Sequence, residues 1–144
     1  MTRRTIFSVL AGAMALTLLA QTSVVQAQTA PATLGIVRLN RGVMADGKPL
    51  AAGSYTLRVA ADPVTPVSGQ GADNAKWVEF VQGGQVKGRE LASVVPPADV
   101  KDVIKGKAPA ANTSKVELLK GGEYLRVWAN RGGNHYLVHL LVGK

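Results

Sequence analysis

The sequence contains no cysteine among its 144 residues. This absence excludes structural disulfides, thiol catalysis and a lipid anchor on a cysteine, so the fold must depend on its hydrophobic core. Acidic residues are also few: 9 Asp and Glu stand against 17 Lys and Arg, which gives a formal net charge of +8. A basic surface suits contact with an anionic polymer as partner. The basic residues are scattered rather than clustered, however, so we expect a generally solvated surface and no specific nucleic acid partner.

Long apolar runs are absent except near the N-terminus, where residues 6–20 follow Arg3 and Arg4. Residues 25–27, Val-Gln-Ala, then place small or β-branched side chains where a signal peptidase would cleave. The apolar run is shorter than the ~20 residues that a bilayer-spanning helix needs. We therefore expect residues 1–27 to be a signal peptide that directs the protein to the periplasm or outside the cell. The paired arginines leave open whether the route is the general secretory one or the twin-arginine one.

After the expected signal peptide, short apolar stretches alternate with glycine-containing breaks. Residues 28–33 are small and polar and predict a flexible leader, and the ~117 residues after the cleavage site can bury a single core. Residues 34–144 predict one all-β domain, an antiparallel β-sandwich or partly closed barrel of about seven strands. One short helix is expected over residues 97–105, where Pro97 stands at the start and Gly106 follows. The expected strands are residues 34–40, 53–61, 75–82, 85–94, 114–120, 123–130 and 135–142.

Two glycine pairs, at residues 121–122 and 132–133, predict the register of the last three strands. If each pair is a two-residue hairpin turn, Glu117 lies opposite Arg126. Opposite charges then meet on one face and apolar side chains meet on the other, which a wrong register would not give. The expected apolar pairs are Val116 with Val127, Leu118 with Leu125, Val127 with Val138, Leu125 with Leu140, and Ala129 with Tyr136.

A third glycine pair, at residues 83–84, leaves the register of its hairpin open. A two-residue loop would set Phe80 beside Lys87. A three-residue loop would instead pair Glu79 with Arg89. The charge pairing favours the three-residue loop.

The other face of the last three strands combines aromatic, basic and aliphatic side chains, with Arg126 across from His139. Such a face suits a ligand or a partner protein. The alternative is that the helix expected at residues 97–105 covers it, in which case its role is structural. The candidate binding residues on this face are Tyr124, Arg126, Trp128, Leu137, His139 and Leu141.

The sequence offers no set of residues typical of a metal site or a catalytic centre. His135 and His139 share a strand face but lie roughly 13 Å apart, too far for one zinc ion that binds nitrogen at ~2.1 Å. No serine stands in a nucleophile elbow, and no glycine-rich phosphate loop precedes a helix. We therefore expect no metal, no other cofactor and no catalytic residues. A small periplasmic hydrolase that uses His139 and Arg126 is the alternative.

The last expected strand is apolar on both faces, unlike the strands at residues 53–61 and 114–120. A strand of this kind is normally covered on both sides. We therefore expect either that the helix packs over Leu137 and Leu141, or that a homodimer or an envelope partner forms a contact there.

Residues 45–59, Ala-Asp-Gly-Lys-Pro-Leu-Ala-Ala-Gly-Ser-Tyr-Thr-Leu-Arg-Val, resemble a run found in exported β-sandwich modules. In the carboxypeptidase-regulatory and transthyretin-like families, the pattern G-x-x-L-x-x-G-x-Y-x-L-x-V joins two strands. The resemblance implies a β-sandwich. Enzymatic members, the hydroxyisourate hydrolases, end in Tyr-Arg-Gly-Ser, whereas residues 141–144 here are Leu-Val-Gly-Lys, so their catalysis is not carried over. The expected function is that of an exported, non-catalytic module with a binding or structural role in or outside the cell envelope.

Overall fold

The computed structural model describes residues 32–65, 71 and 74–144. The expected signal peptide and most of the expected leader lie outside the described residues, and the first strand begins at the last leader residue, Thr33. The elements are β1 (Thr33–Leu39), β2 (Val43–Ala45), β3 (Lys48–Leu50), β4 (Gly53–Val59), β5 (Ala75–Gln82), β6 (Gln85–Val95), α1 (Val100–Val103), β7 (Ser114–Leu118), β8 (Tyr124–Arg131) and β9 (Asn134–Val142).

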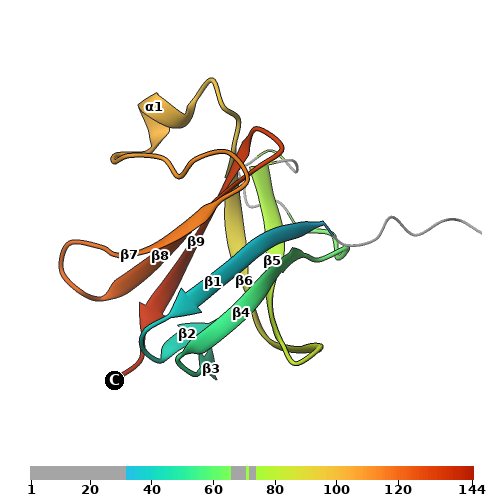
Figure 1. Ribbon diagram of the computed structural model, residues 1–144, viewed down its shortest axis with the longest axis vertical. Helices are drawn as coiled ribbons and strands as arrows, with labels where there is room; N and C mark the ends of the chain where they lie inside the picture. Colours follow the sequence, from blue (N-terminus) through green and yellow to red (C-terminus); the bar gives the residue numbers. More distant parts are fainter. Residues whose placement is uncertain (1–31, 66–70, 72–73) are drawn as a thin grey trace, which may run out of the picture.

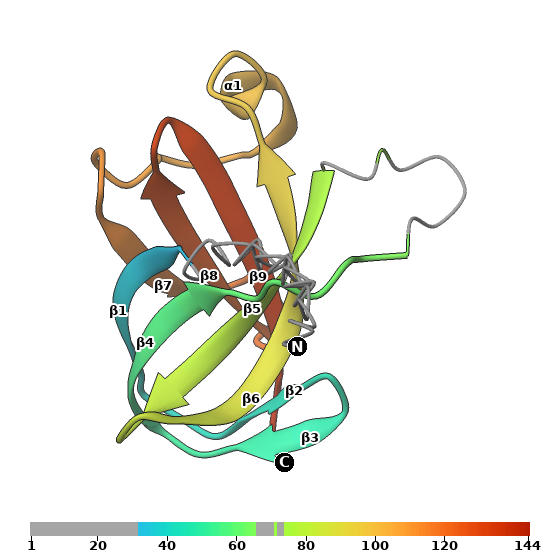
Figure 2. The same cartoon turned by 90° about the vertical axis from the view of Figure 1, so that its right-hand side faces the viewer.

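Within the described residues, the nine strands form one antiparallel sheet that curls into a nearly closed barrel (Figure 1). Around the wall the order is β1, β4, β5, β6, β9, β8 and β7. The two edge strands, β1 and β7, lie side by side, and Ser114 Oγ donates a hydrogen bond to the carbonyl of Ile36 across the seam (3.2 Å). In Figures 1 and 2, α1 lies beyond one end of the sheet and the β2–β3 hairpin at the other. The expected all-β, partly closed barrel is confirmed.

The barrel interior is filled by the inward-facing residues of every wall strand, because side chains alternate between the two faces of a strand. Phe80 is fully buried and packs edge-on against Tyr55, with ring centroids 6.0 Å apart. The Tyr55 hydroxyl donates a hydrogen bond to the carbonyl of Ala51 (2.7 Å), so its polar atom has a partner. Further buried residues of this core are Leu34, Val37, Leu39, Leu57, Val78, Ala92, Leu125, Val127, Ala129, Val138 and Leu140.

The register predicted for the last three strands is confirmed. Glu117 pairs with Arg126 between β7 and β8, and Val127 pairs with Val138 between β8 and β9. The turn between β7 and β8 is not the predicted two-residue turn at Gly121 and Gly122, although the register is the same. The Gly122 N–H donates a hydrogen bond to the Leu119 carbonyl (3.0 Å) and the Leu119 N–H donates one to the Tyr124 carbonyl (2.9 Å), so residues 120–123 form a four-residue loop.

The three-residue loop favoured for the β5–β6 hairpin was wrong, although the Glu79–Arg89 register expected from it is present. Gln82 pairs with Gln85, as in a two-residue turn, and an irregularity after Phe80 then shifts the register by one residue. Glu79 therefore lies opposite Arg89, as predicted. The charge pair that favoured this register is not formed, since Glu79 instead accepts a hydrogen bond from Arg58 Nε (2.7 Å).

The β2–β3 hairpin was not among the expected strands. Each of its strands is only three residues long, and Pro49 lies in the second. The two strands are joined by Asp46 and Gly47, whose φ angles of 47° and 72° are typical of the tight hairpin turn that Asp-Gly favours. The hairpin attaches to the barrel where β2 pairs with the C-terminal end of β9.

The helix expected over residues 97–105 is too long, because α1 is one turn, Val100–Val103. Asp99 at its N-cap makes no side-chain capping hydrogen bond, and Ile104 is already extended (φ −120°, ψ 119°). Valine and isoleucine lose side-chain freedom in a helix, and an isolated single turn is not stable by itself. Packing of the buried side chains of Val100 and Ile104 therefore holds this turn in place.

Candidate functional site

The candidate site is the outer face of β8 and β9, which points away from the barrel interior. Tyr124, Arg126 and Trp128 lie on it opposite Leu141, His139 and Leu137, respectively, as the predicted register requires. Residues 97–109, called the cap below, include α1 and cover only part of this face. Trp128 and Leu137 are buried, with 0% and 5% of their surface exposed, whereas Tyr124 and Leu141 are 43% and 46% exposed. The face is therefore divided into a covered end and an open end.

Under the cap, Trp128 and Leu137 form a second hydrophobic core that is separate from the barrel interior. Val100 and Ile104 of the cap and Val95 of β6 complete it, with Ala108 packed against its side. The prediction that the helix packs over Leu137 is confirmed. Cover of Leu141 by the same helix was wrong, because the cap ends before it reaches that part of β9.

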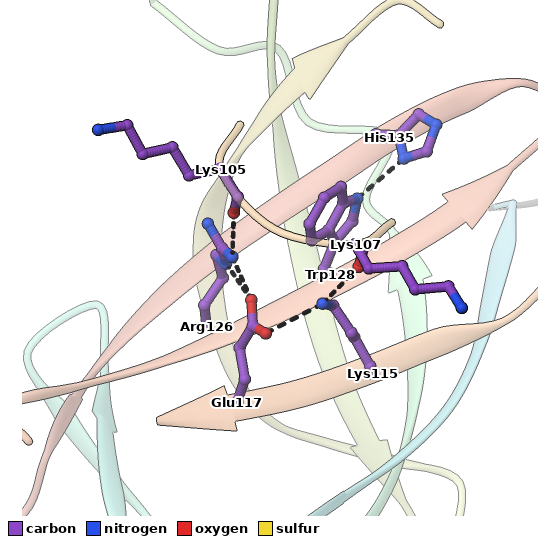
Figure 3. A network of polar contacts seen from close by, with 7 residues as sticks. All are labelled: Lys105, Lys107, Lys115, Glu117, Arg126, Trp128 and His135. Atoms are coloured by element: carbon purple, nitrogen blue, oxygen red, sulfur yellow. Dashed lines mark hydrogen bonds and ion pairs between the residues drawn. The ribbon is translucent and has the colours of Figure 1, made fainter. Parts of the chain in front are cut away.

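Two basic side chains of the sheet hold the cap by its backbone (Figure 3). Arg126 donates a hydrogen bond to the carbonyl of Lys105 (3.1 Å), and Lys115 donates one to the carbonyl of Lys107 (2.6 Å). Both cations lie over the indole of Trp128, at 5.0 Å and 4.7 Å from the ring centroid. Stacked cations of this kind are attracted to the electron-rich ring face, so they also help to hold the indole in place.

Glu117 joins these two cations. Its carboxylate accepts a hydrogen bond from Arg126 Nε (2.6 Å) and forms an ion pair with Lys115 (3.0 Å). Burial by itself would raise the pKa of Glu117. The hydrogen bonds and positive charges of Lys115 and Arg126 outweigh burial and lower this pKa below its ordinary value. Glu117 therefore stays ionised and keeps both cations in position.

His135 is a buried polar residue at the margin of the second core, with 6% of its surface exposed. Its Nδ1 accepts a hydrogen bond from the indole Nε1–H of Trp128 (2.8 Å). Burial lowers the pKa of His135, and an indole can only donate, so the ring is neutral with its proton on Nε2. Sequence reasoning considered His135 only as a metal ligand. The predicted register already placed His135 diagonally across from Trp128 on the same face of β8 and β9. This placement could have predicted the hydrogen bond between the two side chains.

A groove of about 380 Å³ lies between the cap and the β8–β9 hairpin. His135, Asn130 and Lys101 provide its polar lining, and Val100, Ile104 and Ala108 its apolar lining. The side-chain amide of Asn130 donates a hydrogen bond to the carbonyl of Pro109 (3.0 Å), which ties the end of the cap to β8.

The open end of the face has a different character. His139 is exposed beside Arg126, and its pKa is lowered by partial burial and by the positive charge of Arg126. Leu141 pairs with Tyr124 on one side and with Met44 of β2 on the other. A hollow of about 580 Å³ begins here and is lined by Met44, Glu123 and Leu141, among others.

Across residues 32–65, 71 and 74–144, no three His, Asp or Glu side chains gather in a way that could hold a metal ion. The same part of the chain contains no helix that is long and apolar enough to cross a bilayer. Comparison with protein-family models, curated proteins and solved structures gave no match. The resemblance of residues 45–59 to carboxypeptidase-regulatory and transthyretin-like modules thus rests on those residues alone.

Proposed function

We propose that the chain is an exported, non-catalytic module that binds a ligand or partner, or supports one structurally, in the cell envelope or outside the cell. The observation that carries this proposal is that the basic and aromatic side chains on the outer face already form bonds within the protein. Arg126, Lys115 and Trp128 are bound to the cap, to Glu117 and to His135. Side chains that a catalytic site would aim at a substrate are used here to attach one part of the protein to another.

A small periplasmic hydrolase using His139 and Arg126 has less support. The Arg126 side chain is 13% exposed and already bonds to Glu117 and to the Lys105 carbonyl. Stabilising an oxyanion would require these bonds to break, which would leave the half-buried Glu117 with one cation fewer. His139 alone, with its neutral imidazole exposed, lacks the positioned partners that general base catalysis requires.

The absence of catalysis is tested with the purified mature chain and a panel of p-nitrophenyl esters and phosphates. We expect no hydrolysis above the buffer rate for the parent, for His139→Ala or for the control variant Tyr124→Ala, which alters an exposed residue on the same face. Hydrolysis by the parent and by Tyr124→Ala that disappears in His139→Ala would overturn the proposal in favour of the hydrolase.

Export is tested with the full chain carrying a C-terminal epitope tag in a Gram-negative host. We expect the tagged protein outside the cytoplasm, with a mass that corresponds to a first residue of Gln28. A matched chain that lacks residues 2–27 should stay in the cytoplasm. Equal distribution of the two chains, or an uncleaved exported product, would contradict the proposed signal peptide.

A further inference from the structure

We propose that the groove between the cap and the β8–β9 hairpin binds a carboxylate carried on a small apolar body, with His135 and Lys101 as its recognition groups. This inference rests on the proposed binding role, because it names the ligand class of such a module. It follows from three properties of the groove: a hydrogen-bond donor of a buried histidine that has no partner among the described residues, a lysine with no acidic residue beside it in the lining, and an apolar wall.

The donor is the Nε2–H of His135. Because Nδ1 accepts from the Trp128 indole, the neutral ring carries its proton on Nε2, which points away from Trp128 (Figure 3). No hydrogen bond within the described residues engages this nitrogen, yet no fully buried side-chain nitrogen or oxygen in that part of the chain lacks a partner. The Nε2 atom therefore reaches open space, and His135 lines the groove. The contact with Trp128 fixes the orientation of this ring at the groove.

The charge of the groove selects for an anion. Lys101 of α1 lines it together with His135, and none of its lining residues is acidic. Asn130, the other polar lining residue, already uses its amide nitrogen on the Pro109 carbonyl. A carboxylate has two oxygens, so one can accept from the His135 Nε2–H while the other meets the Lys101 ammonium.

The rest of the lining favours a ligand with a hydrocarbon portion over an inorganic anion. Val100, Ile104 and Ala108 form the wall contributed by the cap. The volume of about 380 Å³ falls at the small end of the range of roughly 300–1,000 Å³ that is usual for small-molecule sites. A free phosphate would satisfy the donors but leave the apolar wall in contact with water. A short fatty acid satisfies both parts of the groove.

The test is a titration of the ¹⁵N-labelled mature chain with octanoate, followed by NMR of the backbone amides and of the histidine ring nitrogens. We expect saturable shifts of the cap amides and of His135 Nε2, with His135 Nδ1 remaining unprotonated. Octanol and octylamine, which keep the apolar body but lack the carboxylate, should bind at least about tenfold more weakly, and so should inorganic phosphate.

Lys101→Gln should weaken octanoate binding by about five- to tenfold, since it removes one charge-assisted contact. Lys107→Gln is the matched control: Lys107 also belongs to the cap but does not line the groove, and only its carbonyl holds Lys115. It should change the affinity by less than about twofold. Both side chains are exposed, so neither variant is expected to disturb folding.

Absence of binding at millimolar octanoate would overturn the inference, as would equal affinity of Lys101→Gln and the parent or an unmoved His135 Nε2 signal at saturation. Such a result would leave the export and hydrolysis tests unaffected, so the failure of the ligand class is distinguishable from failure of the proposed function. A tetrapeptide ending in leucine carboxylate offers the same chemistry. If it binds more tightly than octanoate and its amidated form does not bind, the carboxylate comes from a protein C-terminus rather than a free acid.

Discussion

The covered and open ends of the outer face differ although the same two strands build both. Leu137 and Leu141 lie on one side of β9, four residues apart, yet the first is buried and the second is nearly half exposed. The difference comes from the cap, which is largely irregular backbone held by cations that donate to its carbonyls. Apolar residues on the outer face of a strand therefore indicate that another segment should pack over them. In this protein the position of the cap determines which of these residues are buried.

The largest effect is expected from truncating the covered residue. Leu137→Ala removes a side chain from the second core and should lower the free energy of unfolding by about 2–5 kcal/mol, measured by urea denaturation. Leu141→Ala is the matched control, and its loss should stay below about 1 kcal/mol because the side chain is half exposed. Equal losses in the two variants would contradict the division of the face.

A smaller and local effect is expected when the fastening of the cap is removed. Arg126→Met deletes the bonds to Glu117 and to the Lys105 carbonyl, and we expect a loss of about 1 kcal/mol, because Glu117 is partly exposed and stays paired with Lys115. Exchange of the Ile104 amide hydrogen, which bonds to the Val100 carbonyl, should accelerate about tenfold or more, while barrel amides keep their protection.

Arg58→Met is the control for this prediction, because Arg58 forms a comparable pair with Glu79 between β4 and β5, away from the cap. It should leave exchange of the Ile104 amide unchanged. If both variants accelerate that amide equally, the cap is not a separate local unit and opens only with the whole barrel.

The covered end should also make stability depend on pH. Burial lowers the pKa of His135 below its ordinary value of 6.5, so in the range just below pH 6.5 the unfolded chain binds a proton that the folded chain does not. The free energy of unfolding therefore includes a stabilising contribution from neutral His135. This contribution is fully present above pH 6.5 and is lost as the pH falls through the lowered pKa. Urea midpoints should decrease between pH 7.5 and pH 5.

His139 also has a lowered pKa and must be separated from His135. In His139→Gln, most of the decrease should persist, because His139 is exposed whereas His135 is buried and would lose its bond to Trp128 on protonation. A flat pH profile in His139→Gln would assign the effect to the open end instead. Glu117, whose pKa is lowered as well, adds a further loss only below its ordinary value of 4.5.

The smallest effect on stability is expected at the open end. Leu141→Lys should change the free energy of unfolding by no more than about 0.5 kcal/mol, but it should shift self-association to higher concentration in sedimentation equilibrium if the open end is the expected homodimer contact. Leu118→Lys is the matched control, because Leu118 on β7 is also 46% exposed. If both variants keep the association state of the parent, the homodimer prediction for this face is wrong.

The sequence predicted the parts of the fold that depend on local pairing rules. Glycine pairs and alternating side chains were sufficient for the β7–β8–β9 register, and thereby for the six residues of the outer face. The cap was less predictable, because α1 is a single turn held by contacts with Trp128 and Leu137 rather than by helix propensity. The groove beside His135 could not be predicted, since it depends on where an irregular segment meets a strand. The β2–β3 hairpin was missed because three-residue strands give too short a pattern to detect.

The position of β9 in the sheet has a consequence for the timing of folding. The strand β9 pairs with β6, β8 and β2, so it joins the β2–β3 hairpin to strands β7 and β8. The pairing of Val43 with Val142 connects residues that are almost a hundred positions apart, and contacts over such distances form late. Until the ribosome has made β9, the earlier strands lack the neighbour that completes their sheet. We therefore expect β1 to β8 without β9 not to form a stable sheet.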